Sequence, residues 1–308
     1  MTKAGGRIAG IAIAVAVGGA VGPPAANAGE VYGDLDLRYT ATTQNWTELP
    51  GRSTQHTYDP CFGSERLAGI GAWVSESVPK VPNHAGFALG KAYNVAIRPF
   101  DLIPGAPAPD ANEQVADNLF TVNNSLILGE ATVCAASLQA LTYPSGEKPS
   151  PKRSRTVAKV ECGGARRVIS GGGLASGPFR SQRLVSSAPF DSGDAGKKPD
   201  DGWRVAVDNL KRKRRKVEAY AICAHVPGVS YVIDAFGAKK RARDHVSLNC
   251  PAGEFALGGG VTHDIPYRKA TLVASRYAAY PDFDGWFAEV DNLSRKRASG
   301  KVFAICHT

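Results

Sequence analysis

The sequence lacks the short motifs that mark common catalytic and metal-binding sites. It has no C-x-x-C pair and no H-E-x-x-H motif, which excludes the usual zinc patterns. No G-x-S-x-G or G-x-x-x-x-G-K-[ST] segment occurs, which excludes a nucleophile elbow and a P-loop. We therefore expect no cofactor and no metal, and we assign no catalytic residue. Whether the protein is an enzyme stays open, although the sequence favours a noncatalytic role.

Long apolar runs are scarce, and the clearest one lies at the N-terminus. Residues 8–22 form an uncharged run of 15 residues, preceded by Lys3 and Arg7 and followed by the Ala-Asn-Ala segment 26–28. A membrane-spanning helix needs about 20 apolar residues. A basic start, a short apolar centre and an A-x-A site are typical of a signal peptide. We expect cleavage after Ala28 and export of a chain without a membrane span, so the predicted localisation is secreted or extracellular.

Acidic residues and cysteines are also few. The chain has 28 acidic against 37 basic residues, and loss of the signal peptide would lower its formal charge from +9 to +7. Its six cysteines are even in number, and export permits disulfides. The 34 glycines and 20 prolines favour short strands and turns over long helices.

Three copies of one pattern organise the chain. Each copy has a cysteine ten residues before a glycine, as at Cys61, Cys162 and Cys250. The tripeptide Asp-Asn-Leu recurs at 117–119, 208–210 and 291–293, and a second cysteine follows each Asp by 17, 15 and 15 residues. A tryptophan precedes that Asp by five residues in the second and third copies, where the first has Asn112. The predicted organisation is a signal peptide (1–28), then a divergent repeat 1 (29–136), repeat 2 (137–225) and repeat 3 (226–308).

The local pattern within each repeat is that of β-strands. In the segment WRVAVD, Trp203, Val205 and Val207 share one face, and this period of two predicts half-buried strands. The glycine clusters 171–173 and 258–260 lie inside strand-like runs, where glycine permits a bulge or a close backbone approach. We predict an all-β fold of three tandem antiparallel units, each a small sandwich stapled by one disulfide. The alternative is a single domain whose three sheets close about a pseudo-threefold axis, as in β-prisms.

The repeat also selects one cysteine pairing among the 15 that six cysteines allow. It joins the first and last strands of each unit, as Cys61–Cys134, Cys162–Cys223 and Cys250–Cys306.

Two basic clusters are the candidate ligand-binding residues. They occupy equivalent places after Asp-Asn-Leu in repeats 2 and 3, at what we predict to be hairpin connections, and comprise Lys211, Arg212, Lys213, Arg214, Arg215, Lys216, Arg295, Lys296 and Arg297. Two further basic segments, 152–155 and 239–243, lie in loops before the first cysteines. Such clusters need solvent or an anionic partner to offset their repulsion. We interpret Asp208-Asn209 and Asp291-Asn292 as turn-forming residues, and His263-Asp264 as a strand-end pair in solvent.

Repeat 3 resembles a repeat of secreted bacterial proteins of unassigned function, common in high-GC Gram-positive organisms. The resemblance rests on the segments CPAGEFALGGGV, DGW and VFAIC, which repeat 2 matches with CGGARRVISGGG, DGW and AYAIC. It implies export and a β-rich module, and it supplies no catalytic residue or ligand.

The functional hypothesis is an exported binding or surface-associated module whose basic loops engage an anionic cell-wall polymer or an acidic polysaccharide. Nucleic acid is disfavoured because of export and because the loops lack interleaved aromatic residues. Two other hypotheses stay open: a secreted hydrolase with a site between repeats, and a purely structural envelope protein. The sequence does not indicate an oligomeric state.

Overall fold

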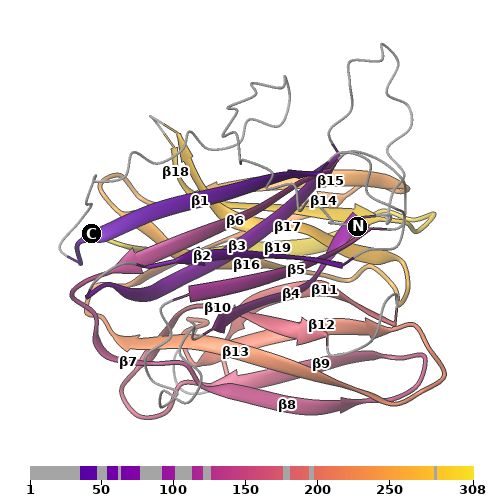
Figure 1. Ribbon diagram of the computed structural model, residues 1–308, viewed down its shortest axis with the longest axis horizontal. Helices are drawn as coiled ribbons and strands as arrows, with labels where there is room; N and C mark the ends of the chain where they lie inside the picture. The colour runs from indigo at the N-terminus through magenta and orange to yellow at the C-terminus, as the bar shows by residue number, and fades with distance from the viewer. Residues whose placement is uncertain are drawn as a thin grey trace, which may run out of the picture.

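The computed structural model describes residues 35–46, 54–61, 64–76, 92–100, 113–120, 126–175, 181–193, 198–280 and 283–308. These residues form 19 strands and no helix, which confirms the all-β prediction (Figure 1). The predicted signal peptide lies outside the described residues. Within them, no helix has the length and apolar character to cross a membrane.

The strands follow the repeats. Repeat 1 contains β1 (Leu37–Trp46), β2 (Thr54–Pro60), β3 (Arg66–Glu76), β4 (Ala92–Phe100), β5 (Glu113–Phe120) and β6 (Leu126–Ala135). Repeat 2 contains β7 (Gln139–Thr142), β8 (Ser145–Ser150), β9 (Arg155–Glu161), β10 (Arg167–Ala175), β11 (Gln182–Phe190), β12 (Gly202–Asn209) and β13 (Arg215–His225). Repeat 3 contains β14 (Ser230–Ala238), β15 (Ala242–Asn249), β16 (Phe255–His263), β17 (Ala270–Tyr280), β18 (Phe283–Asn292) and β19 (Ala298–His307).

Each of the three antiparallel sheets combines strands from two repeats. Sheet A has the order β1-β6-β3-β17-β18-β15, so three strands of repeat 1 continue into three strands of repeat 3. Sheet B has the order β2-β5-β4-β10-β13-β7, with β8 also paired to β13, and joins repeats 1 and 2. Sheet C has the order β14-β19-β16-β11-β12-β9 and joins repeats 3 and 2. The exchange of strands is therefore cyclic, as the alternative arrangement about a pseudo-threefold axis requires.

The two halves of a repeat also pack face to face as a sandwich. In repeat 2, Trp203 of β12 in sheet C covers Gly171 of β10 in sheet B, where an added Cβ would lie 2.5 Å from the indole ring. The indole nitrogen of Trp203 donates to Ser187 Oγ at 2.8 Å, and Trp286 of repeat 3 donates equally to Ser275 Oγ at 3.0 Å. The predicted sandwiches and the alternative closure thus coexist, because the two layers of each sandwich belong to two different sheets.

The disulfides are Cys61–Cys134, Cys162–Cys223 and Cys250–Cys306, the pairs that the repeat predicts. One detail of the prediction is wrong, because the first cysteine of each pair follows β2, β9 or β15, and none of these is the first strand of its repeat. Since the second cysteine lies on β6, β13 or β19, each disulfide links two different sheets. The three bonds therefore staple the layers of the three sandwiches.

The glycine ten residues after each first cysteine marks the seam where two repeats share a sheet. A Cβ on Gly71, Gly172 or Gly260 would lie 2.6, 2.0 or 2.1 Å from the carbonyl oxygen of Ser275, Ile97 or Ser187, respectively. In all three cases the oxygen belongs to the neighbouring repeat's strand. Gly172 and Gly260 thus show the close backbone approach expected of the two glycine clusters, and Gly71 shows the same approach in repeat 1.

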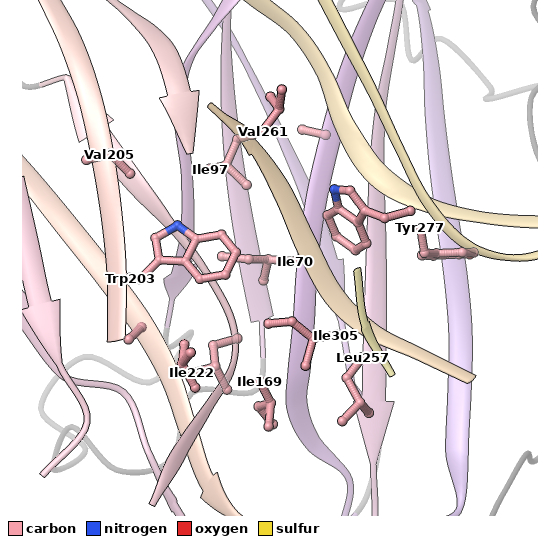
Figure 2. Close-up of a cluster of buried hydrophobic side chains, with 14 of the residues drawn as sticks. Ile70, Ile97, Ile169, Trp203, Val205, Ile222, Leu257, Val261, Tyr277 and Ile305 are labelled. Carbon is pink, nitrogen blue, oxygen red and sulfur yellow. The ribbon is translucent and has the colours of Figure 1, made fainter. Parts of the chain in front are cut away.

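The core is continuous across all three repeats. Figure 2 shows Ile70 of repeat 1, Trp203 and Ile169 of repeat 2 and Leu257 of repeat 3 in one buried cluster. At its centre, the backbone N–H of Ile70 donates to Ser170 Oγ at 3.2 Å, which ties β3 to β10. All three repeats therefore contribute to one hydrophobic core.

Candidate anion-binding surface

The turn that carries the first basic cluster is built by Asn209. Its side-chain amide donates to the carbonyl oxygens of Ser150, Pro151 and Lys213 at 3.2, 2.9 and 2.9 Å. Its side-chain oxygen accepts from the backbone N–H of Lys211 at 3.1 Å. The Asn side chain thus replaces backbone pairing at the point where the chain leaves β12.

Asn292 builds the turn of the second basic cluster in the same way. Its amide donates to the carbonyl oxygens of Ala238 and Lys296 at 3.2 and 3.0 Å, and its oxygen accepts from the N–H of Ser294 at 2.9 Å. The turn-forming interpretation of the Asp-Asn pairs is confirmed for both asparagines.

The preceding aspartates are fully buried and neutralise arginines of the adjacent strands. Asp208 accepts two hydrogen bonds from Arg155, at 2.7 and 3.1 Å, and Asp291 accepts two from Arg243, at 2.7 and 3.3 Å. Two-point arginine–carboxylate pairs are strong and geometrically specific. Part of each basic segment predicted before the first cysteines is therefore structural.

The basic segments of a repeat lie together at one end of the molecule. The backbone N–H of Arg153 donates to the carbonyl oxygen of Lys211, and that of Arg241 donates to Ser294, both at 3.0 Å. These bonds join the β8–β9 loop to the β12–β13 loop and the β14–β15 loop to the β18–β19 loop. In Figure 1 the β8–β9 and β12–β13 connections leave the sheets on the same side.

A short segment between β16 and β17 connects the two clusters. Tyr267 donates through its hydroxyl to the carbonyl oxygen of Asn209 at 2.6 Å, and the carbonyl oxygen of Lys269 accepts from the N–H of Leu293 at 2.7 Å. Only Arg268 lies between these two anchors, and its N–H donates to Asp208 at 2.7 Å. The contacts of residues 267–269 therefore hold the start of the first basic loop, at Asn209, close to the start of the second, at Leu293.

We call the resulting surface the basic strip. It comprises the exposed residues Lys211, Arg212, Lys213, Arg214, Arg268, Lys269, Arg295, Lys296 and Arg297. None of these side chains forms an ion pair with any residue that the structure describes. The strip is therefore a concentrated and uncompensated positive surface.

The structure divides the first predicted cluster. Arg215 and Lys216 belong to β13, Arg215 is half-buried, and the Lys216 ammonium lies 2.9 Å from the Glu147 carboxylate. The predicted hairpin is also wrong, because β12 and β13 lie in sheets C and B and do not pair. Since the loop passes from one layer of the sandwich to the other, its side chains project at the end of the molecule.

Sequence reasoning missed Arg268 and Lys269. Repeat 2 has Pro178-Phe179-Arg180-Ser181 where repeat 3 has Pro266-Tyr267-Arg268-Lys269, so the internal repeat aligns Arg268 with Arg180, whereas Lys269 has no basic counterpart. Their position follows from the contact of a repeat 3 loop with the turn of repeat 2, a contact that no local pattern encodes.

His263 is a structural residue beside this surface. Its Nε2 donates to the carbonyl oxygen of Val185 at 2.6 Å, and its Nδ1 accepts from the N–H of Ile265 at 3.2 Å. Burial lowers the pKa of His263 to about 4, so the ring is neutral at physiological pH. Asp264 is exposed and accepts from the N–H of Ser299 at 2.7 Å. The solvent-exposed interpretation of this pair thus holds for Asp264 and is wrong for His263.

Cys61, Glu65 and Cys134 place candidate metal-ligand atoms within 4.8 Å of one another. Their chemistry does not suit a metal, because the two sulfur atoms form a disulfide and Glu65 pairs with Arg38 at 2.5 Å.

No protein-family model matches the chain, and no curated protein sequence matches it.

Proposed function

We propose that this protein is a secreted, noncatalytic binding module that engages an anionic polymer of the cell envelope through the basic strip. The observation that carries the proposal is the anchoring of two unpaired basic loops by the segment 267–269. Nine cations are thereby gathered without carboxylate partners among the described residues. Export is part of the proposal, and the three disulfides support it.

The turns are rigid where the ligand would bind. Asn209 and Asn292 hold the loop backbones, and Asp208 occupies the N–H of Arg268. Because the loops are fixed before binding, less conformational entropy is lost when a polymer docks. A row of cations on a fixed support suits a repeating anionic chain, which contacts several of them at once.

The chemistry of the strip favours a saccharide or polyol polymer over nucleic acid. Tyr267 is the aromatic residue of the connecting segment, and its hydroxyl is committed to Asn209. A single-strand nucleic-acid site uses several aromatic side chains on which bases stack. Hydrolysis is also less well supported, because both ring nitrogens of the nearby His263 are bonded to backbone groups.

The test compares binding of residues 29–308 to isolated cell walls before and after chemical removal of their anionic polymers. We expect binding to weaken on polymer removal and as salt is raised from about 0.05 to 0.5 M, because exposed charges are screened. The variants are R212Q/K213Q, R295Q/K296Q and their combination. The carbonyl groups of Lys213 and Lys296, which the turn asparagines contact, remain in all three.

The matched control is K148Q/K198Q, which removes the same two charges as either double variant from exposed positions outside the strip. Weaker binding in the strip variants, with wild-type binding in the control, would support the proposal. Equal losses in strip and control variants would reduce the effect to net charge and reject the assigned surface. Binding that is indifferent to polymer removal would reject the anionic polymer as ligand.

A further inference from the structure

A groove of about 500 Å³ lies on the outer face of sheet C, where repeats 2 and 3 share the sheet. Repeat 2 lines it with Arg155 and Val157 of β9 and Arg204 and Ala206 of β12. Repeat 3 contributes residues of β16 and β19, including Lys301, together with Asp264 just after β16. Arg155 and Asp264 lie at the end that carries the basic strip, so the groove opens beside that strip.

The corresponding face of sheet A is filled by side chains. Its Arg276 guanidinium lies 4.9 Å from the ring centres of both Trp73 and Phe287. The repeat pattern equates Trp73 with Thr262, because each lies two residues after a seam glycine, and it equates Phe287 with Arg204, because each follows the repeat tryptophan.

Small residues therefore open the groove in sheet C. Arg276 is equivalent to Ala188, since each follows the serine that accepts from the indole nitrogen. A threonine and an alanine thus stand where sheet A has a tryptophan and an arginine, and an arginine replaces a phenylalanine.

Arg204 is the unexplained charge in this groove. It is half-buried, its Nε lacks a hydrogen-bond partner, and it forms no ion pair with any described residue. Its partner in the strand register is Lys159, so two cations stand directly opposite each other on adjacent strands. Like charges in that position are destabilising. Burial lowers the pKa of Arg204, the direction expected of a guanidinium without a counter-ion.

The other lining groups suggest what accompanies the anion. Val157 is one of two large hydrophobic residues that are clearly exposed in the described structure, at 39%, and it lies near Ala206 in the groove. Thr262 and Ser186 supply hydroxyl groups, and Asp264 supplies a carboxylate that can accept from a ligand hydroxyl. A ring with an apolar face, hydroxyl groups and one negative charge fits this set.

We propose that the sheet C groove binds a carboxylate-bearing pyranose sugar, with its carboxylate on Arg204 and Lys301 and its ring face on Val157 and Ala206. The planar guanidinium fork matches a carboxylate at two points. Asp264 disfavours a dianion, and a polyol phosphodiester lacks the flat apolar face that Val157 would cover. The inference rests on the proposed function in that it names a unit of the anionic polymer, but it concerns a site separate from the nine residues of the basic strip.

The experiment measures binding of single sugars by saturation-transfer NMR and calorimetry with residues 29–308. The probes are the methyl glycoside of glucuronic acid, the neutral methyl glucoside and a glycerol phosphodiester. We expect the uronide to bind and the two other probes to bind at least about tenfold more weakly. R204Q and K301Q should each weaken uronide binding, R204Q by about tenfold or more. R204K should lie between R204Q and wild type, because it retains the charge without the fork.

The basic-strip variant R212Q/K213Q/R295Q/K296Q separates this inference from the proposed function. Unchanged uronide binding in that variant, alongside lost binding to cell walls, would assign the two sites separately. Absence of uronide binding to the folded wild-type protein would overturn the groove assignment, as would unchanged binding in both R204Q and K301Q. Binding of the phosphodiester as tightly as the uronide would also overturn it.

Discussion

The hydroxyl of Tyr39 donates to the carbonyl oxygen of Ala256 at 2.8 Å, across 217 positions of sequence. Tyr143 donates in the same way to Leu67 at 2.9 Å. Tyr231 completes the set with a bond of 2.7 Å to Val168. Each tyrosine thus reaches the glycine-rich strand of another repeat, in the cyclic order 1 to 3, 2 to 1 and 3 to 2. These three hydrogen bonds therefore connect all three pairs of repeats, as the three shared sheets do.

Replacing one of these tyrosines by phenylalanine should lower stability while keeping the fold. In Tyr39→Phe the carbonyl of Ala256 loses its side-chain donor inside the protein, and we expect a loss of about 1–3 kcal/mol in the free energy of unfolding. Urea unfolding monitored by tryptophan fluorescence measures the change. The control is Ile233→Val on the exposed face of β14, expected within about 0.5 kcal/mol of wild type. A Tyr39→Phe variant as stable as the control would contradict this role.

Removal of repeat 3 should unfold the remaining chain. Without residues 226–308, β3 loses β17 and β11 loses β16, so two sheets end in unpaired edges over an opened core. We expect residues 29–225 to lack cooperative unfolding and residues 29–308 to unfold in one transition. Calorimetry distinguishes the cases, and separate transitions for the three repeats would indicate independent units.

The tryptophan of a repeat and the glycine beneath it should be energetically coupled. Gly171 and Gly259 each lie nine residues after a cysteine and under Trp203 and Trp286, whereas repeat 1 has Ile70 in place of the glycine and Asn112 in place of the tryptophan. Gly171→Ala would put a methyl group 2.5 Å from the Trp203 ring and 2.5 Å from the carbonyl oxygen of Tyr220, and overpacking of this kind costs about 1–3 kcal/mol, of which Trp203→Leu relieves the part due to the ring. The double variant Gly171→Ala/Trp203→Leu should therefore lose less than the sum of the two single losses. Additive losses in this double-mutant cycle would show that the contact has no energetic weight.

The cysteines, glycines and Asp-Asn pairs predicted much of this fold because each acts locally or recurs in register. Asn209 and Asn292 bond to nearby backbone groups, so their role follows from residue type and position. The sharing of strands between repeats could not be predicted in the same way. In sheet C, β11 of repeat 2 pairs with β16 of repeat 3 through a single register pair, Ser187 with Val261. A glycine at such a seam indicates that two backbones approach closely, but it does not identify the strand that approaches.

The candidate sites likewise have one part that the sequence predicts and another that depends on contacts between repeats. The basic clusters are visible as runs of charge, whereas Arg268 joins them only because the repeat 3 loop docks on the turn of repeat 2. The groove needed three-dimensional information, because its openness depends on small side chains from two repeats meeting at one face. Arg204 in the sequence resembles any exposed strand arginine, and only the missing partner distinguishes it.

Glu289 should make stability depend on pH in a way that one substitution reveals. Burial, with a further contribution from the Asp291 charge, raises the pKa of Glu289 from 4.5 to about 7, although Arg243 and Arg276 oppose the shift. Between these two pH values the folded state holds a proton that the unfolded state has released. Stability from this group therefore falls as pH rises through that interval.

Glu289→Gln removes the proton linkage and keeps the shape of the side chain. We expect its stability relative to wild type to increase between pH 5 and pH 8, by on the order of 1–3 kcal/mol. His263, whose pKa is lowered to about 4, makes stability rise with pH between about 4 and 6.5 in both proteins, so it cancels in the comparison. Urea unfolding at pH 5, 6, 7 and 8 measures the difference. A difference that stays constant over this range would mean that Glu289 is ionised in the folded protein throughout, with its charge offset by Arg243 and Arg276.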